Sequence, residues 1–136
     1  DITYTTGNAG ENNHTLDFGF KSAATCSVSL TATPGNCNPI NNQYTLTGSV
    51  TFSNAPTSGT MTVSVSGGGS QTFTPPFTSP QNYSITGLTA DGTSHTVTVS
   101  FSADATCSNT TTYTAPVSCS TNCPVKRCAT VDVKKN

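Results

Sequence analysis

The chain has 136 residues, of which 32% are hydrophobic and 8% charged, and its formal net charge at pH 7 is −1. A charge this close to zero argues against nucleic acid as a partner, because nucleic-acid binding needs a basic surface. No apolar run approaches the ~20 residues of a membrane-spanning helix, so we expect no membrane span. Low hydrophobicity with little net charge and many Thr and Val residues predicts a folded all-β protein with a thin core.

Residues 1–25 predict an N-terminal arm with two short strands, at residues 2–6 and 14–20. The second of these strands alternates apolar and polar residues, so its large apolar side chains share one face. These side chains are Leu16, Phe18 and Phe20.

Residues 26–119 predict an immunoglobulin-like β-sandwich of about seven strands, because short alternating segments are separated by turn signals every ~8–12 residues. The expected strands are residues 27–33, 43–53, 60–66, 71–73, 82–88, 95–101 and 110–117. Residues 43–53 give the strongest pattern, with four large apolar side chains on one face. Gly48 shares that face, which predicts a β-bulge there. Pro75 and Pro76 cannot donate to a ladder and predict an edge or a loop.

The stretch 88–101 contains an Asp91-Gly92 turn followed by strict alternation. It resembles the corner and sixth strand of fibronectin type III and related immunoglobulin-like sandwiches, on Leu88, Gly92, Thr93, Val97 and Val99. The corner tyrosine of such folds is replaced by His95, so the resemblance does not imply the usual corner hydrogen bond.

Residues 120–136 predict a C-terminal arm. Cys123 and Cys128 bracket a short loop in it, and residues 129–135 predict one more strand with Val131 and Val133 on one face.

Several segments of the sandwich resemble the immunoglobulin-like repeats of tandem surface proteins, the adhesins, of Bacteroidetes-type bacteria. They are residues 32–39, 50–54, 76–80, 87–92 and 112–119. Residues 13–20 resemble the last strand of the Cna B-type (SdrD B-like) domains that often precede such repeats. The resemblance implies a secreted, structural or adhesive protein of the cell surface, with no catalytic residues to carry over. Here, however, the last strand of one domain type stands without the domain that would hold it.

The strand at residues 14–20 needs a host sheet. Burying its three apolar side chains contributes roughly 5–8 kcal/mol, whereas ordering its backbone costs on the order of 7–14 kcal/mol. Main-chain pairing with a sheet edge would supply the difference, as in donor-strand complementation. The host is either the same sandwich, as an eighth strand, or a neighbouring subunit. Donation from subunit to subunit that does not close into a ring makes a filament.

Six cysteines in a small Thr-rich chain predict disulfides and an extracellular or cell-surface location. We expect the pairs Cys37–Cys107, Cys26–Cys119 and Cys123–Cys128, each contributing ~2–4 kcal/mol. The alternatives are an intermolecular disulfide between arms, or a metal site at Cys119, Cys123 and Cys128. The spacing of those three does not match paired Cys-x-x-Cys motifs, so we expect no metal.

No catalytic or cofactor motif is present, so we expect neither an enzyme nor a cofactor. His14 and His95 lie in strand patterns and are interpreted as structural, and the six acidic residues are scattered. Three Asn-x-Ser/Thr sequons make Asn13, Asn82 and Asn109 candidate glycosylation sites.

The combined interpretation is a structural subunit of a bacterial extracellular filament or surface appendage. It would assemble head to tail with copies of itself through a donated terminal strand, and glycans are candidate partners, covalent or bound. One alternative is an adhesin module that recognises glycan or protein through its end loops, where Phe77 is the one clear aromatic residue. Another is an accessory domain of a secreted enzyme.

Overall fold

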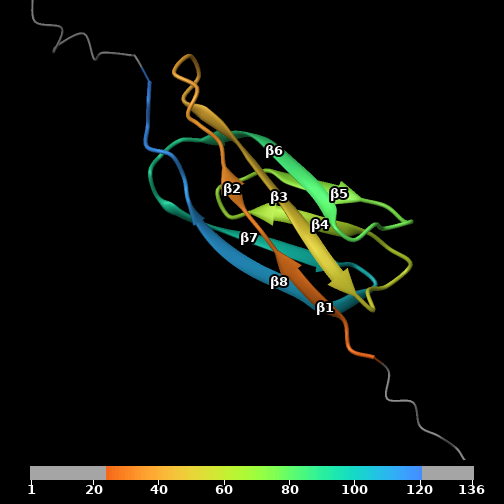
Figure 1. Ribbon diagram of the computed structural model, residues 1–136. Coiled ribbons are helices and arrows are strands. Elements are labelled where there is room, and N and C mark those ends of the chain that lie inside the picture. The colour runs from red at the N-terminus through yellow and green to blue at the C-terminus, as the bar shows by residue number, and fades with distance from the viewer. Residues whose placement is uncertain (1–23, 121–136) are drawn as a thin grey trace, which may run out of the picture.

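The computed structural model describes residues 24–120, which form two antiparallel sheets packed face to face (Figure 1). The first sheet holds β1 (Ser27–Leu30), β2 (Thr33–Pro34), β3 (Gln43–Ser53) and β6 (Gln81–Thr89). The second holds β4 (Met61–Val65), β5 (Ser70–Phe73), β7 (Ser94–Phe101) and β8 (Asp104–Thr114), in the order β5-β4-β7-β8. This confirms the predicted all-β sandwich. Most of both predicted arms, residues 1–23 and 121–136, lies outside the described residues.

Strand β3 is the centre of the first sheet. It pairs with β6 along one side and with β1 and β2 along the other. Its ends are those predicted from the alternation of apolar residues, and Tyr44, Leu46 and Val50 are buried on its inner face. β1 and β2 keep one register along β3, from Ser27 opposite Ser53 to Pro34 opposite Leu46. The single strand expected at residues 27–33 is therefore one continuous path with a short interruption.

The interruption between β1 and β2 comes from Thr31. Its backbone N–H donates to the Ser49 carbonyl (3.0 Å), but its side-chain hydroxyl, rather than its carbonyl, accepts from the Ser49 N–H (2.9 Å). The Thr31 carbonyl instead accepts a hydrogen bond from the Tyr83 hydroxyl (2.5 Å), which reaches it from β6 across Gly48. A Cβ on Gly48 would collide with the Thr31 carbonyl and the Tyr83 ring.

The bulge predicted at Gly48 is wrong in position. The register of β3 and β6 shifts between Tyr44 and Leu46, where β6 contributes the extra residue next to Gly87. Gly87 has φ +78°, a left-handed conformation that glycine adopts without steric cost. Gly48 is instead the place where a tyrosine from the neighbouring strand crosses β3.

The core lies between the two sheets and consists of the inward residues of every long strand. The largest fully buried side chains are Phe101, Leu46, Met61, Val50, Val63, Val97, Val99 and Cys107. Each large apolar side chain of this kind contributes ~1.5–3 kcal/mol by leaving water. The edge-to-face rings of Phe52 and Phe77 pack on Phe101 at 5.5 Å and close one end of the core.

Strand β8 starts earlier than the sequence predicts, at Asp104 instead of residue 110, and ends at Thr114. A tight turn at Ser102 and Ala103 brings Phe101 opposite Asp104, so β8 follows β7 almost at once. Residues 104–109 are polar apart from Cys107 and Ala105, and therefore lack the apolar alternation that signals a strand. Cys107 lies inside β8 and is buried, where a loop was expected.

The chain enters and leaves the sandwich at opposite ends (Figure 1). At the entry end, the Thr25 carbonyl accepts a hydrogen bond from Asn54 in the loop after β3 (3.3 Å). At the exit end, the backbone N–H of Cys119 donates to the Asn42 side chain in the loop before β3 (2.9 Å). The terms entry end and exit end are used below for these two ends.

The predicted cysteine pairing is wrong for the four described cysteines. The disulfides join Cys26 to Cys107 and Cys37 to Cys119, with Cα–Cα distances of 5.4 and 6.0 Å. Because β8 begins directly after the tight turn, Cys107 lies at the entry end beside Cys26. Cys37 lies at the exit end beside Cys119, so the expected pairs would have to span the length of the sandwich.

Candidate functional site

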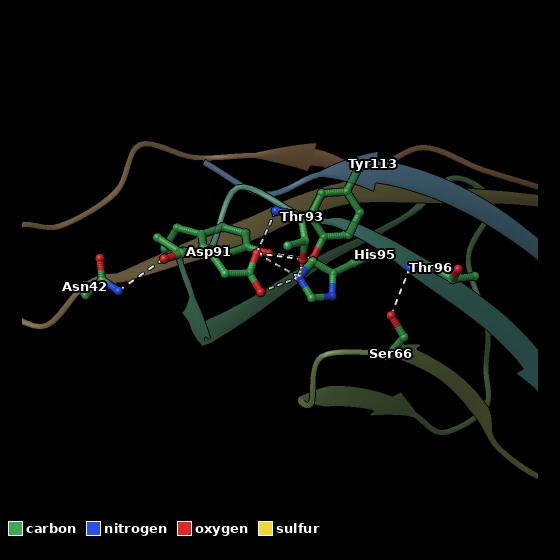
Figure 2. Close-up of polar contacts among 9 residues, drawn as sticks. Asn42, Ser66, Asp91, Thr93, His95, Thr96 and Tyr113 are labelled. Atoms are coloured by element: carbon green, nitrogen blue, oxygen red, sulfur yellow. Dashed lines mark hydrogen bonds and ion pairs between the residues drawn. The ribbon is translucent and has the colours of Figure 1, made fainter. Parts of the chain in front are cut away.

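The turn between β6 and β7, at the exit end, holds a cluster of polar side chains (Figure 2). The Asp91 carboxylate accepts hydrogen bonds from the backbone N–H and the hydroxyl of Thr93, both at 2.9 Å. These two bonds, in that order, followed by weaker contributions from His95, hold the pKa of Asp91 below its usual value. Gly92, with φ +72°, completes the turn that the sequence predicts here.

His95 lies against this carboxylate. Its Nε2 atom is 3.2 Å from both carboxylate oxygens of Asp91 and 3.2 Å from the Thr93 hydroxyl. The imidazole ring is tilted by 31° against the ring of Tyr113 in β8, with the centroids 5.9 Å apart. The histidine at this corner thus joins the turn before β7 to the neighbouring strand β8.

A pair of tyrosines continues the contact into the core. The hydroxyls of Tyr113 and Tyr44 are 2.6 Å apart, and the two rings meet edge to face at 6.3 Å. Tyr113 comes from β8 and Tyr44 from β3, so this hydrogen bond joins the two sheets. Burial, followed by the hydrogen bond to Tyr44, raises the pKa of Tyr113 well above its usual value.

The Asp91, Thr93 and His95 side chains are those of a hydrolytic triad, but their geometry is different. In a triad, the histidine binds the carboxylate with one ring nitrogen and the hydroxyl with the other. Here Nε2 faces both groups, and the other side of the ring covers Gly67, where a Cβ would lie 2.8 Å from Nδ1. The cluster therefore stabilises the turn and does not have the arrangement of a triad.

Asn42 is a second polar centre at the exit end, and the sequence pattern did not reveal it. Its side-chain oxygen accepts hydrogen bonds from the hydroxyl of Ser118 and the N–H of Cys119, both at 2.9 Å. Its side-chain nitrogen donates to the carbonyl of Ala90 (3.1 Å), as Figure 2 shows. The residue has φ +56°, which asparagine tolerates better than most residues. These three hydrogen bonds of its side chain reach residues 48 to 77 positions away in sequence, so no local signal predicts them.

An apolar groove of about 640 Å³ lies at the entry end, between the loop after β3 and the loop after β5. Phe52, Phe77 and three prolines, Pro56, Pro75 and Pro76, supply most of its apolar lining. The two prolines that the sequence places at an edge or loop lie in the loop that leads from β5 to β6. The groove can take an apolar side chain or a short extended segment.

Two large apolar side chains are exposed at the other end. Ile40, in the loop between β2 and β3, is 91% exposed, and Val117, in the segment that follows β8, is 74% exposed. Val117 lies against Gly92, in the turn that holds Asp91 and Thr93. The exit end therefore presents apolar side chains, and the entry end presents an apolar groove.

The remaining predicted site residues have varied positions. Asn82 is exposed on β6, whereas the side-chain nitrogen of Asn109 donates to the Val28 carbonyl (2.6 Å) at the edge between the sheets. The other candidates lie outside the described residues: Asn13, His14, Leu16, Phe18, Phe20, Val131, Val133, Cys123 and Cys128.

Residues 24–120 contain no cluster of three or more His, Cys, Asp or Glu side chains that could hold a metal ion. In the same part of the chain, no helix has the length and apolar character needed to cross a membrane. Comparisons with protein-family models, curated proteins and solved structures find no match for this chain.

Proposed function

We propose that this chain is a structural subunit of an extracellular filament or surface appendage, assembled head to tail by donation of a terminal strand. The observation that carries the proposal is the position of the chain ends. The first described residue, Ala24, lies at the entry end, and the last, Ser120, follows Cys119 at the exit end (Figure 1). The two predicted arms therefore begin at opposite faces of a potential stack of subunits.

The surfaces of the two ends support the same arrangement. A stack that brings the exit end of one copy onto the entry end of the next would place Ile40 near the groove of Phe52 and Phe77. Such a contact uses two different surfaces of the same molecule. Repetition of a contact of this kind gives a filament unless the rotation between copies closes a ring.

The free edges of the sheets suggest where a donated strand would pair. On one side of the sandwich, β1 and β8 are already joined by the Cys26–Cys107 disulfide and by the Asn109–Val28 hydrogen bond. On the other side, β5 and β6 are bridged by the hydrogen bond from the Ser84 N–H to the Gln71 side chain (2.7 Å). β6 is nine residues long and pairs with a strand on one side only. Its other edge, where the Ser84 N–H is already bonded to Gln71, is the acceptor that we propose for the strand predicted at residues 14–20.

The two described disulfides and the low charge suit an oxidising, extracellular setting. The segments that resemble repeats of bacterial surface proteins support the same location.

A binding module is the second candidate, because the apolar groove is large enough to hold a ligand. The aromatic side chains of the groove argue against this second candidate. Phe52 and Phe77 both pack edge to face on the core residue Phe101 and do not form an exposed platform on which a ligand could stack.

Electron microscopy and sedimentation of the purified full chain test the assembly. We expect filaments with a regular axial repeat for the native sequence. The Phe18→Asp substitution should abolish them, because a charge on the apolar face blocks burial of the donated strand. Thr15→Asp adds the same charge to the polar face of that strand and should leave them intact.

A second matched pair tests the end contact. Ile40→Asp should shorten or abolish the filaments, and Asn36→Asp, in the same loop, should not. Monodisperse native monomers at high concentration would contradict the assembly. If residues 14–20 were then protected from hydrogen exchange, the arm would be the eighth strand of its own sandwich. If they were unprotected, ligand binding at the groove would become the leading hypothesis.

A further inference from the structure

The two disulfides connect the same pair of chain segments at both ends. Cys26 is bonded to Cys107 and Cys37 to Cys119, with sequence separations of 81 and 82 residues. Between them, the side chain of Asn109 donates to the carbonyl of Val28, again 81 residues away. Because the separation is nearly constant, residues 26–37 and 107–119 run side by side in the same direction. Figure 1 shows β1, β2 and β8 in this arrangement along one edge of the sandwich.

Both segments are already extended in the folded protein. The first follows β3 in one register, and hydrogen bonds from the N–H groups of Thr31 and Gly35 continue the pairing past the ends of β1 and β2. The second contains most of β8, paired with β7 as far as Thr114. A strand rises about 3.3 Å per residue, close to the ~3.6 Å limit of a fully drawn chain. Neither segment can therefore lengthen much.

This connectivity gives two short covalent routes through the domain. One route leads from Cys26 along the first segment to Cys37 and across the disulfide to Cys119. The other crosses from Cys26 to Cys107 and follows the second segment to Cys119. Residues 38–106, which form most of both sheets, lie on neither route. A pull on the two chain ends is therefore carried by covalent bonds that bypass the core.

We propose that the sandwich is a tension-bearing link whose length is set by these two segments and not by the stability of its core. Either disulfide alone is sufficient, because each leaves one route of eleven or twelve residues between Cys26 and Cys119. Without either, unfolding would lengthen the chain by on the order of 300 Å. The inference concerns one copy of the domain and does not depend on filament assembly. It would apply to any surface protein that is held at both ends.

Single-molecule force spectroscopy tests this directly. The full chain is held between reference domains attached without thiol chemistry, in a Cys123→Ala/Cys128→Ala background that removes the other two cysteines. We expect the form with both disulfides to show no extension step of the sandwich longer than roughly 10 Å. The variants Cys26→Ala/Cys107→Ala and Cys37→Ala/Cys119→Ala should each behave in the same way. Removal of all four cysteines should produce a step on the order of 300 Å.

A step of that size in either two-cysteine variant, with the remaining pair oxidised, would overturn the proposal. If the cysteine-free variant does not fold, the oxidised protein can be held under force while a reductant is added. The long step should then follow cleavage of the second disulfide only. A long step after the first cleavage would contradict the redundancy of the two routes.

Discussion

At the scale of single residues, Asn42 holds the exit end together. It joins the loop before β3 to Ala90, at the end of β6, and to the segment that leaves the sandwich at Ser118 and Cys119. The Cys37–Cys119 disulfide connects two of the same segments. The hydrogen bonds of Asn42 therefore orient a region that the disulfide only keeps close.

Replacing Asn42 by alanine should lower the free energy of unfolding by about 2–3 kcal/mol, because three hydrogen bonds are lost at ~0.5–1.5 kcal/mol each and alanine fits a left-handed backbone less well. Urea denaturation measures the change. Asn36→Ala is the matched control, since Asn36 is exposed in the same loop and its side chain makes no hydrogen bond among the described residues. A loss for Asn42→Ala no larger than for this control would show that the disulfide alone orders the exit end.

At the scale of elements, the strands of the first sheet are joined by a close contact at Gly48. The Tyr83 ring crosses β3 at this point to reach the Thr31 carbonyl, and it thereby joins β6 to the path of β1 and β2. No other residue type leaves room for the ring, because any Cβ collides with it. The interruption between β1 and β2 and the glycine in β3 are two parts of one contact.

We expect Gly48→Ala to destabilise the fold by about 2 kcal/mol or more, since overpacking a tight contact costs ~1–3 kcal/mol and the Thr31–Tyr83 hydrogen bond is also disturbed. Thermal and chemical denaturation measure the loss. Ser53→Ala, at an exposed position of the same strand, should change stability by less than ~0.5 kcal/mol. Equal stability of the two variants would mean that the strands can separate at Gly48 without cost.

At the scale of the whole molecule, prediction from the sequence succeeded where local alternation carried the information. β3 was found with its ends because apolar residues alternate along it, and the Asp91-Gly92 turn was found from its composition. The start of β8 was missed because Asp104 to Asn109 show no alternation. The cysteine pairs depend on which end of the sandwich holds each cysteine, and the alternation within a strand does not report this. The partners of Asn42 depend on contacts between distant segments, which periodicity does not report.

The folded protein should become less stable in alkali. Burial raises the pKa of Tyr83 to about 12 and raises that of Tyr113 further, while an unfolded tyrosine titrates near ~10. The folded state therefore keeps these protons where the unfolded state has released them. The contribution of these two tyrosines to the free energy of unfolding is complete below pH ~10. It is lost as the pH rises toward their folded-state pKa values, by up to ~1.4 kcal/mol per pH unit for each tyrosine.

Urea denaturation at pH 8 and pH 11 measures this loss. Tyr83→Phe should be less stable than the native protein at pH 8, because the hydrogen bond to Thr31 is missing. It should, however, lose less stability between the two pH values. An equal loss in both proteins would show that Tyr83 does not contribute to the alkaline transition.

The positions of the chain ends also decide how the gene for this domain can be rearranged. Copies of the sandwich placed end to end in one polypeptide need only short connections, because the exit end of one copy then lies next to the entry end of the following copy. A circularly permuted version would need a connection along the whole sandwich, which is about 36 Å for a strand as long as β8. Duplication is thus a simple change for this fold, and permutation is a costly one.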